Sequence, residues 1–173
     1  SLQILDRDAR LDEFVDSAEA DSSRPLPIWR RDSIESYLLV PAAIGRLVAA
    51  KRSDTEEATV QSFVEGRMAA GIEALRDETV DRIGTRYRRD IIDTQGRNVE
   101  PKEANEFARK VMEDEDSVLR LTRGKSLLSR VRKDVQDEFG VSFGNQALIA
   151  EMTEEEFDPE IIHILDQIDA LMT

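Results

Sequence analysis

The feature that most constrains the fold is a long run of apolar residues spaced three or four positions apart, which begins after Asp54. Its members are Val60, Phe63, Val64, Met68, Ile72, Leu75, Val80 and Ile83. This spacing places them on one face of a helix, so it predicts one amphipathic helix or two helices in series. Three glycines interrupt the run, and glycine lowers helix propensity. A chain with such a middle section is predicted to be built mainly from helices.

Start and stop signals indicate further helices on both sides of this run. Pro41 and Pro101 suit the first turn of a helix, where a missing N–H costs nothing. Gly140 follows an apolar-periodic segment, as a C-terminal cap does. Asp158 followed by Pro159 is a strong helix start. We expect about six helices in all.

Only two segments have the character of β-strands, and both lie near the start of the chain. They are the apolar residues 2–5 and the segment LPIWR at residues 26–30. Two strands do not make an independently stable sheet. Either the fold is mainly helical with a small strand pair, or the front of the chain is the edge of a larger α/β domain. In both cases the predicted fold class is mainly α with a small α/β portion at the N-terminus.

The composition narrows the compartment and the kinds of site. No segment approaches the ~20 apolar residues that a membrane helix needs, and the first residues lack the pattern of a secretory signal. We therefore expect no contact with a membrane and a cytoplasmic location. The sequence has no cysteine, which excludes disulfides and thiolate metal sites.

The charge is unevenly distributed along the chain. A net charge of −13 argues at first against nucleic acid as a partner, because lysine and arginine drive binding to phosphates. Yet residues 24–52 carry six basic and two acidic side chains, residues 82–97 carry five and two, and residues 120–133 carry six and none. An acidic protein can still present a basic groove, since the local field decides. For any single block, a solvated helix face is the simpler interpretation.

Two carboxylates, Asp6 and Asp8, follow the first apolar segment. Side chains alternate along a strand, so the two would face the same way, about 6.5 Å apart. Such a pair can share a divalent cation such as Mg²⁺, which favours oxygen ligands. Aspartate is also a common turn residue that hydrogen-bonds its own backbone, so the pair alone leaves both interpretations open.

Four short motifs add to this pair. They are LDRDAR at residues 5–10, LPIWRRDSIESYLL at 26–39, GKSLL at 124–128 and EEEFDPEII at 154–162. Together they resemble the C-terminal part of the Toprim domain in overcoming-lysogenization-defect (OLD) family ATP-dependent endonucleases. In that family an Asp-x-Asp pair ends a central strand, a later strand leads into a helix that begins with a glutamate-containing pattern, and Gly-Lys precedes a C-terminal helix.

The resemblance implies a DNA endonuclease that depends on Mg²⁺ or Mn²⁺. Two metal ions would hold the attacking and leaving oxygens of a phosphodiester displacement. Asp6, Asp8 and Glu35 would be metal ligands, and Lys125 would be the catalytic cation that stabilises charge on the scissile phosphate. Glu35 also has a structural alternative, as the capping-box partner of Asp32.

The same resemblance implies how the chain is organised. The basic block at residues 120–133 would lie beside the DNA, with contacts from Arg123, Arg130 and Lys133. The implied regions are the C-terminal part of a Toprim-like core at 1–40, a helical insertion or bundle at 41–120, and C-terminal helices that pack back on the core at 121–173.

Two parts of the family pattern are missing from these 173 residues. Toprim domains carry an essential glutamate on an earlier strand, and OLD proteins carry an ABC-type ATPase domain. We therefore expect a fragment that is inactive alone and in which Mg²⁺ or Mn²⁺ is absent or weakly bound. The expected partners are DNA, the upstream Toprim strand and the ATPase domain, with a homodimer as an option. The alternative is a helical interaction or dimerisation module, formed by residues 41–120, without catalytic activity.

Overall fold

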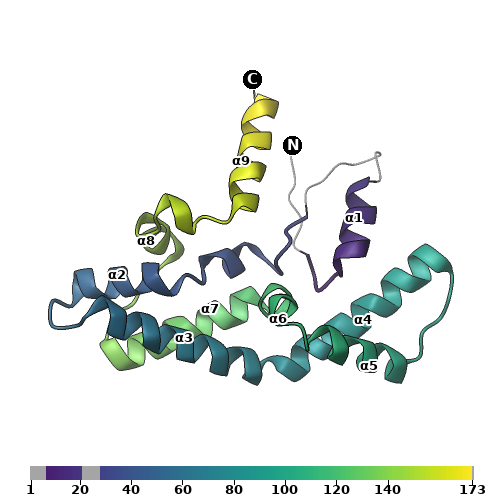
Figure 1. Ribbon diagram of the computed structural model, residues 1–173, viewed down its shortest axis with the longest axis horizontal. Coiled ribbons are helices and arrows are strands. Elements are labelled where there is room, and N and C mark those ends of the chain that lie inside the picture. Colours follow the sequence, from purple (N-terminus) through teal and green to yellow (C-terminus); the bar gives the residue numbers. More distant parts are fainter. Residues whose placement is uncertain (1–6, 21–27, 173) are drawn as a thin grey trace. The chain divides into compact units, whose positions relative to one another are not determined.

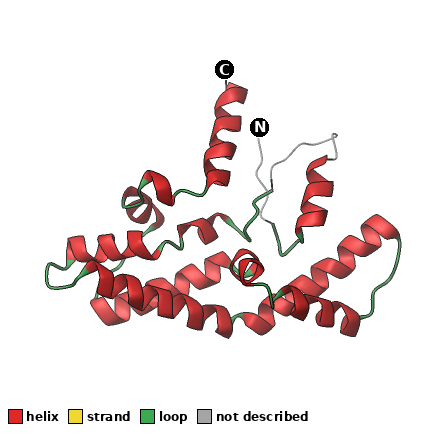
Figure 2. Cartoon of the chain, in the orientation of Figure 1, coloured by secondary structure: helices red, strands yellow, loops and turns green. Residues whose placement is uncertain are grey.

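The computed structural model describes residues 7–20 and 28–172, and helices dominate it (Figures 1 and 2). Helices make up 74% of the structure, which confirms the prediction of a mainly α fold. The described ranges contain nine α-helices, where about six were expected. They are α1 (Asp12–Ala20), α2 (Pro41–Lys51), α3 (Glu57–Ala74), α4 (Arg76–Gln95), α5 (Pro101–Val111), α6 (Glu115–Leu121), α7 (Gly124–Phe139), α8 (Asn145–Ala150) and α9 (Pro159–Met172). Two short 3₁₀ helices are η1 (Ile34–Leu38) and η2 (Glu154–Glu156).

The two strands predicted from the sequence have different outcomes. The first, at residues 2–5, lies outside the described residues. Of the second, residues 28–30 are described, and they form no strand: Ile28 has isolated bridge geometry, while Trp29 and Arg30 are irregular. Ile28 and Trp29 are only 5% and 6% exposed, so both are buried although their segment is irregular. Burial in the core, rather than a strand, explains their apolar side chains.

Most helix boundaries follow the sequence signals. Pro41 and Pro101 each open a helix as predicted. Gly140 follows the end of α7 with a φ of 69°, and its N–H donates to the carbonyl oxygen of Gln136 at 2.9 Å. A left-handed residue at this position is the usual C-terminal cap, and glycine adopts it without steric cost. Pro159 opens α9, which confirms the last start signal.

The capping box expected at Asp32 and Glu35 is not formed. The backbone N–H of Asp32 donates instead to the carbonyl oxygen of Arg120, at 2.8 Å. A capping-box glutamate needs that same N–H. The segment that follows is the 3₁₀ helix η1 rather than the start of an α-helix.

The chain divides into two compact units, and each unit is assembled from two separate stretches. Unit 1 consists of Ser1–Ile34 and Ala74–Arg123, and unit 2 consists of Glu35–Glu73 and Gly124–Thr173. Residues 41–120 contribute to both units. The division into a Toprim-like core at 1–40, a helical insertion at 41–120 and C-terminal helices at 121–173 stays a prediction.

Unit 1 is organised around the packing of α4 against α5. One cluster of buried side chains contains Ala9, Val80, Ile83, Ala108, Met112 and Leu121, and a second contains Phe14, Ile91, Val99 and Ala104. Tyr87 of α4 stacks on Phe107, with ring centroids 4.2 Å apart, and meets Phe14 edge-on. Burial of each large apolar side chain contributes about 1.5–3 kcal/mol. These contacts fix the inner face of α4 and leave another face for charged residues.

Unit 2 is organised around α7. Four of its side chains, Leu127, Leu128, Val131 and Val135, are at most 1% exposed. Val60 and Val64 of α3 are also fully buried, and Phe63 meets Phe139 edge-on with ring centroids 5.1 Å apart. Helices α2 and α8 pack against each other in the same unit. The apolar face of α7 is therefore occupied by the core.

Gly71 of α3 is predicted to be required for this packing. A Cβ at position 71 would lie 2.6 Å from Cδ1 of the fully buried Leu127, whereas a Cβ at Gly66 would meet nothing within 4 Å. Gly71→Ala should therefore destabilise the fold by about 1–3 kcal/mol through overpacking. The matched change Gly66→Ala should stabilise it by about 0.5–1 kcal/mol through helix propensity.

Urea unfolding followed by circular dichroism measures both effects. Equal shifts in the two variants would show that α3 and α7 do not approach as closely at Gly71 as described.

Candidate functional site

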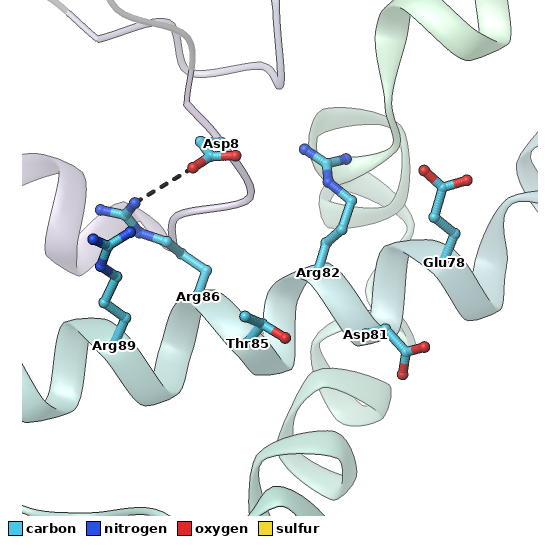
Figure 3. A pocket seen from close by; sticks show the side chains of 7 residues that line it. All are labelled: Asp8, Glu78, Asp81, Arg82, Thr85, Arg86 and Arg89. Atoms are coloured by element: carbon cyan, nitrogen blue, oxygen red, sulfur yellow. Dashed lines mark hydrogen bonds and ion pairs between the residues drawn. The ribbon is translucent and has the colours of Figure 1, made fainter.

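One face of α4 carries charged side chains at helical spacing. Glu78, Arg82, Arg86 and Arg89 recur every three or four residues, so they lie along one stripe. This stripe lines a cavity of about 480 Å³ within unit 1 (Figure 3). The lining residues are Asp8, Glu78, Asp81, Arg82, Thr85, Arg86 and Arg89. The cavity thus combines three guanidiniums with three carboxylates.

Asp8 reaches this cavity from a tight turn. Asp8 and Ala9 both adopt left-handed conformations, with φ values of 52° and 58°. The extended geometry expected from the sequence therefore does not hold at Asp8, and Asp6 lies outside the described residues. The Asp8 side chain is 72% exposed, and its Oδ2 lies 3.5 Å from Nη1 of Arg86.

A buried arginine holds this turn in place. Arg7 is 3% exposed, and its guanidinium donates to the carbonyl oxygens of Arg10 and Arg30. The same group pairs with Asp12 at 2.8 Å. Burial lowers the pKa of Arg7, while the charge of Asp12 opposes that shift. Burial would raise the pKa of Asp12, but the hydrogen bond from Arg120 and the charge of Arg7 outweigh it, so that pKa is lowered.

Two of the cavity arginines are engaged by buried carboxylates. Arg82 donates from Nη2 to Asp32, which is 4% exposed. Arg86 donates from Nε to both carboxylate oxygens of Asp90, each at 3.1 Å. Burial raises the pKa of Asp90, and the hydrogen bond from Arg86 opposes that shift. Arg86 therefore has its Nε committed to the fold, while its Nη1 faces Asp8.

Arg89 is the exposed guanidinium of the cavity. Within the described ranges it makes no side-chain hydrogen bond or ion pair, although its charge acts on the neighbouring Asp90. Figure 3 shows the Arg89 and Arg86 side chains on the same side of α4, the side on which Asp8 lies. Two neighbouring guanidiniums with free donors form a natural binding place for an oxyanion.

The residues predicted to form the nuclease site are distributed over both units. Asp8 and Arg123 belong to unit 1, and Arg123 pairs with Glu78 at 3.2 Å. Unit 2 contains Glu35, Lys125, Arg130 and Lys133. The last three are exposed side chains of α7. The structure brings Asp8 close to Arg86, whereas the convergence of Asp8 and Glu35 on one metal stays a prediction.

Glu35, which was predicted to be a metal ligand, has one side-chain oxygen that the fold does not use. It is partly buried, and its Oε2 has no hydrogen-bond partner among the described residues. Burial lowers the pKa of Arg132, and the charge of Glu35 opposes that shift. A buried carboxylate oxygen without a donor is costly unless something else binds it. The Glu35 oxygen therefore retains a lone pair for a cation or a water molecule.

Sequence reasoning did not identify Arg82, Arg86 and Arg89 as cavity residues. Their spacing of four and three was visible within the basic block at residues 82–97, and it predicts a common helix face. What the spacing does not reveal is that Asp8, more than 70 residues earlier in the chain, lies opposite that face.

Comparisons with known proteins gave no relative. No protein-family model matches the sequence, and neither curated proteins nor solved structures yielded a match. The resemblance to OLD family endonucleases therefore rests on the short motifs and remains a prediction.

Within residues 7–20 and 28–172, no three His, Asp or Glu side chains are grouped so that they could hold a metal ion, and Asp6 lies outside these ranges. None of the helices there combines the length and the apolar character needed to cross a membrane.

The ion pairs of Asp12 predict a pH-dependent contribution to stability. Because the folded-state pKa of Asp12 is lowered from 3.8, its contribution is fully present above about pH 4 and is lost as the pH falls through the folded-state value. Asp12 is half exposed, so we expect Asp12→Asn to cost roughly 1 kcal/mol or less at pH 7.

Urea unfolding at pH 7 and at pH 3 measures this difference, with the exposed Asp137→Asn as the control. The stability of Asp12→Asn should approach that of the wild type at the lower pH. A difference that grows on acidification would contradict the assignment.

Proposed function

We propose that this chain is part of a Mg²⁺- or Mn²⁺-dependent endonuclease of the Toprim type, related to the OLD family. The observation that supports the proposal best is the exposed carboxylate of Asp8 at a cavity lined by arginines. A metal ligand must be accessible to a hydrated cation, and a phosphodiester substrate must meet positive charge nearby. The exposure of Asp8 and the arginines that line its cavity support both requirements.

The donor set also suits a hard divalent cation. Asp6, Asp8 and Glu35 offer carboxylate oxygens, the ligand type that Mg²⁺ and Mn²⁺ prefer. The unpartnered Oε2 of Glu35 fits a ligand role. When bound, the metal would supply charge stabilisation for phosphodiester hydrolysis. Lys125 would add a cation beside the phosphate, in the role that the motif resemblance assigns to it.

The exposed basic residues of α7 are the proposed DNA contacts. Arg130 and Lys133 are exposed on a helix whose apolar face is buried in the core. Charged side chains in this position bind phosphates without sequence preference and release counterions. The catalytic activity itself is proposed for the whole parent enzyme, which would also contain the earlier Toprim strand and the ATPase domain.

Metal binding tests the role of the Asp-x-Asp pair. Titration with Mn²⁺, followed by the electron paramagnetic resonance of the free ion, should show saturable binding. Asp8→Asn and Asp6→Asn should each weaken it by at least about tenfold, since even the hydrogen-bond partner of a ligand is worth about 10- to 100-fold. The control Asp137→Asn removes an exposed carboxylate elsewhere and should leave Mn²⁺ affinity unchanged.

Mn²⁺ affinity that is the same in all three variants would contradict the metal proposal. The alternative, a helical interaction module at residues 41–120, predicts a different result. It requires a concentration-dependent oligomer or a captured partner whose binding is indifferent to Asp6→Asn and Asp8→Asn.

DNA binding tests the exposed face of α7. Arg130→Gln and Lys133→Gln should each weaken binding of duplex DNA and reduce the slope of log K against log salt by about 1, because each removes one phosphate contact. Fluorescence anisotropy at several salt concentrations measures both quantities. Lys102→Gln, which removes an 89% exposed lysine on α5, is the control. An unchanged slope in the α7 variants would place the DNA elsewhere.

A further inference from the structure

The cavity on α4 contains donors that the fold does not use. Arg89 is exposed and unpaired within the described ranges, and Arg86 turns Nη1 away from Asp90. The two arginines are three residues apart on α4, so they lie on one face of that helix, and Figure 3 draws both side chains on the side of α4 that faces Asp8. Both arginines therefore present N–H donors to the same cavity. Paired guanidiniums match the oxygen geometry of a phosphate group.

The group that now faces these donors is the carboxylate of Asp8. Its contact with Arg86 is long, at 3.5 Å, and the side chain is 72% exposed. It is presented by two successive left-handed residues, and such a conformation is unfavourable for Ala9. Asp8 is therefore a weakly held oxyanion that any stronger oxyanion must displace or push aside.

The charges at this end of the cavity are balanced without a bound ligand. Arg10, Arg86 and Arg89 face Asp8, Asp90 and Asp93, so Arg86 and Arg89 stand out through their free donors rather than through a net charge. At the other end, Glu78 is paired with Arg123, and Figure 3 shows Glu78 and Asp81 away from Arg89.

We infer that this cavity is a phosphate-binding site in which Arg86 and Arg89 hold the phosphate oxygens and Asp8 is the competing internal anion. When phosphate binds, its oxygens accept hydrogen bonds from Arg86 and Arg89, and the contact between Asp8 and Arg86 is broken. The site lies wholly in unit 1 and uses none of the basic residues of α7. It rests on the proposed function in one respect, since the same arginines supply the positive charge near Asp8, but it requires no bound metal.

The inference predicts opposite effects for two substitutions in one cavity. Asp8→Asn removes the competing charge and should tighten binding of inorganic phosphate about threefold, the size expected from an exposed ion pair. Arg89→Gln removes a charged donor and should weaken binding about tenfold. Arg97→Gln is the matched control, because it removes an exposed arginine from the same unit, outside the cavity.

Inorganic phosphate is titrated at constant ionic strength, balanced with chloride, while the arginine Nε–Hε resonances are followed by nuclear magnetic resonance. Phosphate affinity in Asp8→Asn that is unchanged or weaker would overturn the inference. So would an Arg89→Gln variant that behaves like Arg97→Gln. Circular dichroism checks that each variant is folded, which is expected since Asp8 and Arg89 are exposed.

Competition identifies the source of the phosphate. Displacement by a short DNA duplex but not by adenosine monophosphate points to a nucleic-acid backbone, and the reverse points to a free phosphomonoester; both outcomes support the site. The metal proposal is tested by a different measurement. In Asp8→Asn it requires weaker Mn²⁺ binding, whereas the present inference requires tighter phosphate binding, so each result can occur without the other.

Discussion

A buried guanidinium determines where the candidate site of unit 1 lies. Arg7 is joined through its side chain to Arg10, Arg30 and Asp12, and its backbone N–H donates to the carbonyl oxygen of Asp32 at 3.2 Å. A buried guanidinium is costly unless acceptors surround it. The segments that contain Arg10, Arg30 and Asp12 are therefore held together because each supplies an acceptor to the buried Arg7 guanidinium. The neighbouring residue, Asp8, faces the α4 cavity as a consequence.

The pairing of charged side chains also explains how an acidic protein can contain a cationic site. A net charge of −13 describes the whole chain, but the field inside a cavity depends on which charges are already paired. Buried Asp32 engages Arg82, and buried Asp90 engages Arg86. These pairs orient the stripe on α4, while Arg89 contributes charge without a structural commitment in the described residues. The paired Arg82 and Arg86 thus orient the stripe on α4, whereas Arg89 supplies positive charge to the cavity.

The sequence predicted what depends on local backbone chemistry. Pro41, Pro101 and Gly140 act within one helical turn, so the ends of α2, α5 and α7 followed from their neighbours alone. The failures involve long-range contacts. Ile28 and Trp29 suggested a strand because burial in a core and burial in a sheet require the same apolar residues. The turn at Asp8 depends on the contact of Arg7 with Arg30, more than 20 residues away, which no local pattern encodes.

The discontinuous construction of the two units has a consequence for the order of synthesis. The chain passes from one unit to the other after Ile34, after Glu73 and after Arg123. Unit 1 therefore cannot be completed until the ribosome has released residue 123. At typical elongation rates the first 34 residues wait on the order of ten seconds for their partners. Phe14 meets Ile91, Val99 and Ala104 in the core of this unit, so the nascent chain exposes Phe14 to chaperones and proteases until those residues have been made.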